Sequence, residues 1–213
     1  MENKREIRFM PAEVRAEESA EHGKEIKGYP IVFEQEIDLG FCREVIDAEA
    51  IGDGSVLRDV ALLANHDFGM IPMARSRRNN ENSTMKLTPD QHGVAMRAVL
   101  DTENNPKAKE AYSAVNRGDI TGMSFAFIVN EERWTDLDTD KPLRRIMSFS
   151  RIFEVSLVTE PAYKGTSVQA AAADDTLESV KVSLDSARQQ LADERAKTQE
   201  KERRENALAI LRK

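Results

Sequence analysis

Short runs of apolar and β-branched residues recur through the middle of this 213-residue chain. Turn-forming residues separate them, a pattern typical of strands in an antiparallel sheet. The runs occupy residues 28–33, 56–64, 83–89, 93–100, 122–129 and 144–159. The pattern therefore predicts a mainly β fold of the α+β class, with an antiparallel, barrel-like core.

Two segments, 43–51 and 105–118, carry helical signals instead. In the second, Pro106 suits the first turn of a helix, and apolar residues then recur at spacings of three and four. Gly118 suits the position just past the helix end. We therefore expect a few helices around the sheet.

The two ends of the chain differ from its middle. Residues 1–25 are polar with little apolar periodicity, which predicts a flexible N-terminal arm. From residue 176 onward the chain has no Pro or Gly, and apolar residues from Leu177 to Leu191 follow a heptad-like spacing. This segment is either a short coiled coil or a solvated single helix stabilised by local ion pairs. The expected organisation is an arm, a domain at 26–168 and a helical tail at 169–213.

Composition narrows the possible functions. A net charge of −7 disfavours nonspecific binding to nucleic acid or to an anionic membrane. The apolar runs are far shorter than the roughly 20 residues of a membrane span, and the N-terminus lacks an apolar signal core, so we expect a cytosolic protein. The single cysteine, Cys42, excludes an intrachain disulfide and a cysteine-rich zinc site. Without phosphate-loop, dinucleotide, zinc-protease or EF-hand motifs, the sequence predicts no cofactor and no metal.

His66 has the most suggestive context of the three histidines. It follows an apolar run directly, in LLANHD, so its ring would be held at the end of a rigid element, where catalytic residues often lie. The alternative is a hydrogen-bonded structural histidine. His22 and His92 lie in polar surroundings and are interpreted as solvated.

A histidine is the usual base for a hydroxyl nucleophile, so a serine on an ordered strand is of interest. Strand alternation in GMSFAFIV places Ser124 and Ala126 on one face and bulky side chains on the other. The alternative is a hydroxyl satisfied by the backbone. The competing nucleophiles are Ser148, Ser150, Ser156 and Cys42, and a lone cysteine in an apolar context is more often a small buried hydrophobe.

Glu154 interrupts a strongly apolar run, IFEVSLV. An unpaired carboxylate there would be costly, so Glu154 needs a partner. A histidine that gains a proton during acyl transfer is one candidate. The alternative is a salt bridge to Arg144, Arg145 or Arg151.

The order of the motifs GYPIVF, EVID, LLANHD, NRGDITGMSFAF and FEVSLVTEPAY resembles the phage prohead protease family over residues 26–168. That family is similar to the herpesvirus assemblin proteases, which are β-barrels ringed by helices and use serine chemistry. The resemblance places the family's N-H-D histidine on His66 and its M-S-F serine on Ser124.

The third catalytic position follows less directly from the resemblance. The glutamate of the family's E-V-S-x-V stretch falls on Glu154, which we choose over Asp67 and Glu160. The segment after His66 lacks the expected Leu-Gly-Arg, and Arg75 occupies only the approximate arginine position. That departure leaves an oxyanion or substrate role for Arg75 in doubt.

The resemblance implies a serine endopeptidase that cleaves the scaffolding region of the major capsid protein, and itself, during prohead maturation in the host cytoplasm. No cofactor is implied. The tail would bind a partner helix, either the capsid protein's scaffolding segment or a second copy, and would be removed near QAAAADD, after Val168. The alternatives are a nonenzymatic scaffold or assembly protein that acts through its helical tail, and a small-molecule esterase. The esterase is disfavoured because the chain has no G-x-S-x-G motif.

Overall fold

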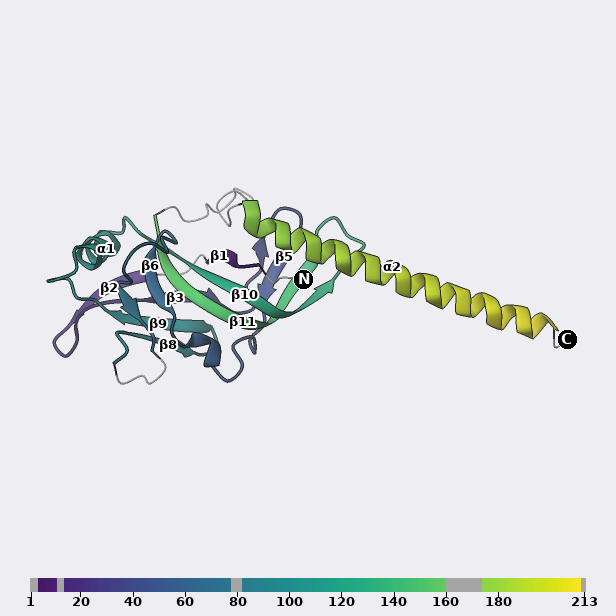
Figure 1. Ribbon diagram of the computed structural model, residues 1–213, viewed down its shortest axis with the longest axis horizontal. Coiled ribbons are helices and arrows are strands. Elements are labelled where there is room, and N and C mark those ends of the chain that lie inside the picture. Colours follow the sequence, from purple (N-terminus) through teal and green to yellow (C-terminus); the bar gives the residue numbers. More distant parts are fainter. Residues whose placement is uncertain (1–3, 11–13, 78–81, 160–173, 212–213) are drawn as a thin grey trace.

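The computed structural model describes residues 4–10, 14–77, 82–159 and 174–211, and Figure 1 shows sheets at one end and a long helix extending from them. In chain order the elements are β1 (Glu6–Met10), β2 (Val14–Ser19), β3 (Gly23–Val32), β4 (Ile37–Asp38), β5 (Arg43–Ile46), the 3₁₀ turn Ser55–Leu57, β6 (Ala61–Ala64), β7 (Ala74–Arg75), β8 (Met85–Pro89), β9 (Gly93–Val99), α1 (Pro106–Arg117), β10 (Gly122–Thr135), β11 (Leu143–Val158) and α2 (Asp174–Leu211).

The described strands form two sheets. The larger has the order β1-β10-β11-β5-β4, with β6 paired to β11 and β7 paired to β6. It is mixed, because β11 runs antiparallel to β10 but parallel to β5 and β6. The smaller sheet, β2-β3-β9-β8, is antiparallel throughout. The mainly β class is confirmed, but these strands do not form a closed barrel, so the barrel-like detail is not.

The long strands β10 and β11 build the centre of the core. Met123, Phe125 and Phe127 alternate along β10, are fully buried, and belong to the main hydrophobic cluster. Phe125 and Phe127 stack with ring centroids 4.6 Å apart. Burying a side chain of this size contributes roughly 1.5–3 kcal/mol. The opposite face of β10 is thereby left for Ala126 and Ser124.

Helix α1 matches the sequence prediction. The side chain of Asn105 accepts hydrogen bonds from the backbone N–H groups of Lys107 and Ala108, which caps the first turn. Gly118 follows the last turn with a φ of 79°, a left-handed conformation that glycine adopts without a steric penalty.

The helix predicted for 43–51 is wrong. Residues 43–46 form β5, followed by turns. Val45 and Ile46 are β-branched and pair in parallel with Arg145 and Ile146 of β11. Burial in this sheet favours the extended conformation more strongly than a short helical pattern favours a helix.

The N-terminal segment also differs from the predicted flexible arm. β1 pairs with β10 along its whole length, and β2 pairs with β3. Arg8 is fully buried and Glu6 is nearly so. Two of the charges that suggested an arm, those of Glu6 and Arg8, instead form buried ion pairs.

These ion pairs form a buried ion cluster of Glu6, Arg8, Glu44, Glu132 and Arg144, which joins β1, β5, β10 and β11. Arg8 Nε lies 2.5 Å from Glu44 Oε1, and Arg144 Nη1 lies 2.8 Å from both Glu6 Oε2 and Glu44 Oε2. Burial disfavours the charged form of Arg8, but Glu44 and Glu6 outweigh it and raise the pKa of Arg8. Burial likewise opposes ionisation of Glu44, yet Arg8 and Arg144 lower its pKa. Arg8 and Glu44 therefore favour their charged forms.

Helix α2 begins by docking on the larger sheet. Leu177 and Val180 are buried in a small cluster with Leu39 and Cys42, and Trp134 Nε1 donates to Ser183 Oγ at 2.9 Å. The part of the predicted tail that the structure describes is helical. The first positions of its apolar seam, however, pack on the chain's own domain and not on another helix.

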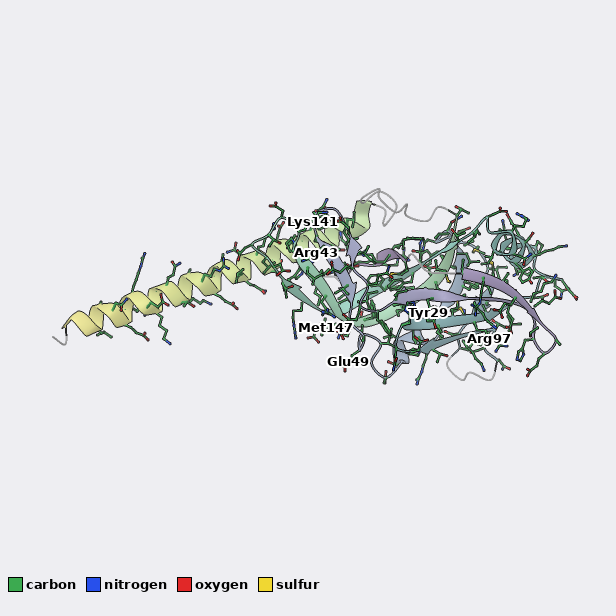
Figure 2. The ribbon with its side chains drawn as sticks, turned by 180° about the vertical axis from the view of Figure 1, so that it is seen from behind. Tyr29, Arg43, Glu49, Arg97, Lys141 and Met147 are labelled. Atoms are coloured by element: carbon green, nitrogen blue, oxygen red, sulfur yellow. The ribbon has the colours of Figure 1, made fainter. Side chains whose placement is uncertain are left out.

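Farther along, α2 leaves the sheets. Arg195 pairs with Asp138 in the turn between β10 and β11, beyond which the helix extends away from the sheets (Figure 1). Figure 2 shows Arg43 and Lys141 at the end from which α2 extends, while Tyr29 and Arg97 lie on the smaller sheet. Within the described residues, no helix is both long and apolar enough to cross a bilayer.

Candidate active site

A tight turn after β6 positions His66. Parallel pairing brings Ala64 beside Leu157 of β11, and Asn65 and His66 then adopt φ values of 48° and 58°. This left-handed conformation is uncommon for residues other than glycine. The backbone N–H of Asn65 donates to Leu157 O at 2.9 Å, and Thr159 N donates to Asn65 Oδ1 at 3.0 Å. The turn is therefore held in place by β11.

The imidazole of His66 contacts Glu154. Nδ1 lies 2.7 Å from Glu154 Oε1, and the side chain of Glu154 is 1% exposed while that of His66 is 19% exposed. A carboxylate only accepts hydrogen bonds, so the proton of this contact is assigned to Nδ1, and in the neutral ring Nε2 is then the acceptor. Of the partners considered for Glu154, the histidine is therefore the one that it contacts. Arg144 and Arg145 bind other carboxylates, and Arg151 stacks on Phe153.

Ser124 lies on the same face of the larger sheet as Glu154. It is the direct cross-strand partner of Ser156, and residues opposite one another in an antiparallel pair have Cβ atoms about 5 Å apart. Ser124 is 1% exposed, and its hydroxyl donates to the backbone oxygen of Arg8 at 2.9 Å. In the part of the chain that the structure describes, this hydroxyl is not hydrogen-bonded to His66. The hydroxyl of Ser124 is thus hydrogen-bonded to the backbone, which is the alternative to a catalytic role that the sequence left open.

Ser156 connects these groups, a role that the sequence analysis missed. Its hydroxyl donates to Glu154 Oε2 at 2.5 Å and accepts from His66 N at 3.1 Å. From its sequence context, Ser156 is interpreted only as a competing nucleophile. The available signal was the spacing of two residues from Glu154, which puts both side chains on one face of a strand.

The alternative carboxylates do not replace Glu154. Asp67 accepts a hydrogen bond from the backbone N–H of Gly69 at 2.9 Å and forms no described contact with the imidazole. Glu160 lies outside the described residues.

The remaining candidates are engaged elsewhere. Ser148 accepts from Asn130, and Ser150 donates to Ile128 O. Arg75 Nη1 donates to Asp59 O at 2.8 Å, and its described contacts include neither His66 nor Ser124. The structure thus adds no support for an oxyanion role of Arg75.

Cys42 is a poor nucleophile in this environment. It is fully buried, and burial, with a smaller contribution from Glu44, raises the pKa of its thiol to about 12. Because the reactive form is the thiolate, we expect iodoacetamide at pH 8 to modify the folded protein at least about a hundredfold more slowly than the denatured protein. Intact-mass measurement over time tests this. Equal rates would return Cys42 to the set of candidate nucleophiles.

His66 and Glu154 are thus in contact as the base and the acid of a serine hydrolase triad would be, whereas the hydroxyl of Ser124 is bound to a backbone carbonyl. Among the described residues, no group of three His, Cys, Asp or Glu side chains is placed to hold a metal ion.

The family comparison agrees with that class. The family model described as caudovirus prohead serine protease matches residues 10–181, and the chain therefore belongs to that family. No curated protein and no solved structure matches the chain. The family match begins before the predicted domain at 26–168 and extends into the docked turns of α2, to residue 181.

Proposed function

We propose that this protein is a prohead maturation endopeptidase in which Ser124 is the nucleophile, His66 the general base and Glu154 the residue that orients the imidazole. The 2.7 Å contact between His66 Nδ1 and Glu154 Oε1 is the observation that carries the proposal. The location of Ser124 beside Ser156, on the same face, supports it. The family description supports the reaction class.

In the proposed mechanism, Ser124 first exchanges its hydrogen bond to Arg8 O for one to Nε2 of His66. His66 then removes the hydroxyl proton as Oγ attacks the scissile carbonyl carbon, and Glu154 stabilises the imidazolium. Backbone N–H groups stabilise the oxyanion. His66 gives the proton to the leaving amine, which departs as the peptide C–N bond breaks. Water, deprotonated by His66, hydrolyses the acyl-enzyme and restores Ser124.

The substrate assignment rests on the family. A phage prohead protease acts on capsid proteins in the assembling shell within the host cell. For this chain we propose the scaffolding region of the major capsid protein, and the chain itself, as substrates. The rival role of a nonenzymatic scaffold acting through its tail has less support, because Leu177 and Val180 already pack on the domain. The small-molecule esterase has no observation in its favour.

Self-processing is tested by expressing the wild type and Ser124→Ala side by side and comparing intact masses. The proposed junction follows Val168, in QAAAADD, of which residues 169–173 lie outside the described residues and Asp174 begins α2. We expect the wild type to lose the tail and the variant to keep it. Loss in both proteins would identify another protease, and retention in both would refute self-processing.

The docking of α2 adds a second expectation for the cleaved protein. Leu177, Val180 and Leu184 are buried, and burying each of these side chains stabilises the docked helix by roughly 1.5–3 kcal/mol. After cleavage the helix should therefore stay attached in native size-exclusion chromatography and separate in denaturant.

A further inference from the structure

We infer that Ser156 is a positioning residue of the proposed active site, which fixes both the carboxylate of Glu154 and the main chain of His66. This inference rests on the proposed function. Its hydroxyl is fully buried, gives its one proton to Glu154 Oε2 and accepts the backbone N–H of His66. One side chain thus contacts both members of the histidine–carboxylate pair.

The first consequence concerns the orientation of Glu154. Its two carboxylate oxygens have different partners, His66 Nδ1 on Oε1 and Ser156 Oγ on Oε2. A terminal carboxyl torsion is soft, so a single hydrogen bond leaves the group free to rotate. With both oxygens engaged, Oε1 is held toward the imidazole. Among the described residues, every buried side-chain polar atom has a partner, and Ser156 completes that pairing for Glu154.

The second consequence concerns the turn that carries His66. Asn65 and His66 both have positive φ values, a conformation that must be held by its surroundings. Ser156 Oγ accepts from the backbone N–H of His66, and Leu157 O accepts from that of Asn65. Adjacent residues of β11 therefore hold the two left-handed residues, and Ser156 is the one that acts through its side chain.

The third consequence concerns Ser124. Because Ser156 is the cross-strand partner of Ser124, the group that holds the base lies directly opposite the proposed nucleophile. Ser156 is unsuited to be the nucleophile, since its proton points to a carboxylate and its described contacts do not include a ring nitrogen of His66. Its role is to set the distance between the base and Ser124.

The variant Ser156→Ala should lower kcat about ten- to a hundredfold with little change in KM, since misplacing a catalytic group by about 1 Å costs on the order of a hundredfold. Ser156→Thr keeps the hydroxyl and should recover most of the rate. The matched control is Ser150→Ala, an exposed serine of the same strand that donates to Ile128 O. Melting temperatures of all variants report whether the fold is kept.

The measurement is the rate at which a fluorophosphonate probe labels Ser124, together with kcat and KM for a capsid-protein substrate. Slow labelling by Ser156→Ala with recovery in Ser156→Thr supports the inference. Wild-type rates in Ser156→Ala overturn it while leaving the proposed function intact. Failure of the wild type to label or cleave overturns both. If Ser156→Ala does not fold, Ser156→Cys, similar in size but a weak donor, replaces it, and a wild-type rate in that variant also overturns the inference.

Discussion

Ser124→Ala is expected to abolish proteolysis, with a loss in kcat on the order of a millionfold, as for other triad nucleophiles. The fold should survive, because the substitution removes one hydroxyl and its hydrogen bond to Arg8 O, a contribution of about 1 kcal/mol. The measurement is cleavage of purified capsid protein followed by gel and mass analysis, with a thermal melt for the fold.

Two further variants sharpen that test. His66→Ala should lose as much activity as Ser124→Ala, whereas Glu154→Gln should be roughly ten- to a hundredfold less severe, because the third residue orients and does not transfer the proton. Ser148→Ala, which loses a hydrogen bond from Asn130 on the same strand pair, is the control and should cleave normally. Activity of Ser124→Ala within tenfold of the wild type would refute its assignment.

Arg144→Met is expected to lower the free energy of unfolding by about 3–5 kcal/mol, the usual loss when one partner of a buried ion pair is removed. The side chain of Arg144 is 2% exposed and binds Glu6, Glu44 and Glu132. Without it, Arg8 alone would face the buried carboxylates of Glu6 and Glu44. Urea denaturation monitored by circular dichroism gives the midpoint and slope from which the loss is obtained.

The neighbouring residue supplies the control. Arg145 has a side chain that is 30% exposed and pairs with Glu34 and Asp47, so Arg145→Met should cost at most about 1 kcal/mol. Equal losses at both positions would contradict a special role for the buried ion cluster.

Because the pKa of Glu44 is below its ordinary value of 4.5, its stabilising contribution is complete above that pH. It is lost as the pH falls through the lower pKa of the folded state.

Local patterns predicted the parts of the fold that depend on near neighbours. The capped helix at Pro106–Arg117 and the alternation of Met123, Phe125 and Phe127 follow from spacing alone. The same holds for the location of His66 just past a buried strand, and for the need of Glu154 for a partner. Each of these features is set by residues within a few positions of one another.

The sequence predictions were wrong or incomplete where contacts between residues far apart in the sequence determine the structure. β5 is extended because β11, about a hundred residues later, lies beside it. The N-terminal segment is predicted as a flexible arm because the partners of Glu6 and Arg8, which are Arg144 and Glu44, are remote in sequence. The role of Ser156 depends on the turn at His66, 90 residues earlier. Hydrogen bonds across such separations leave no periodic signal in the chain.

The pairing of β1 with β10 also has a consequence for folding during synthesis. Arg8 and Ser124 are joined by a hydrogen bond across 116 positions, and β11 follows β10 in the chain. At 5–20 residues per second, a ribosome needs roughly 6–23 s to make that interval, during which β1 has no strand to pair with. Contacts this far apart in sequence are typical of slow folding. The surroundings of Ser124 and His66 therefore assemble late, once β11 has been made.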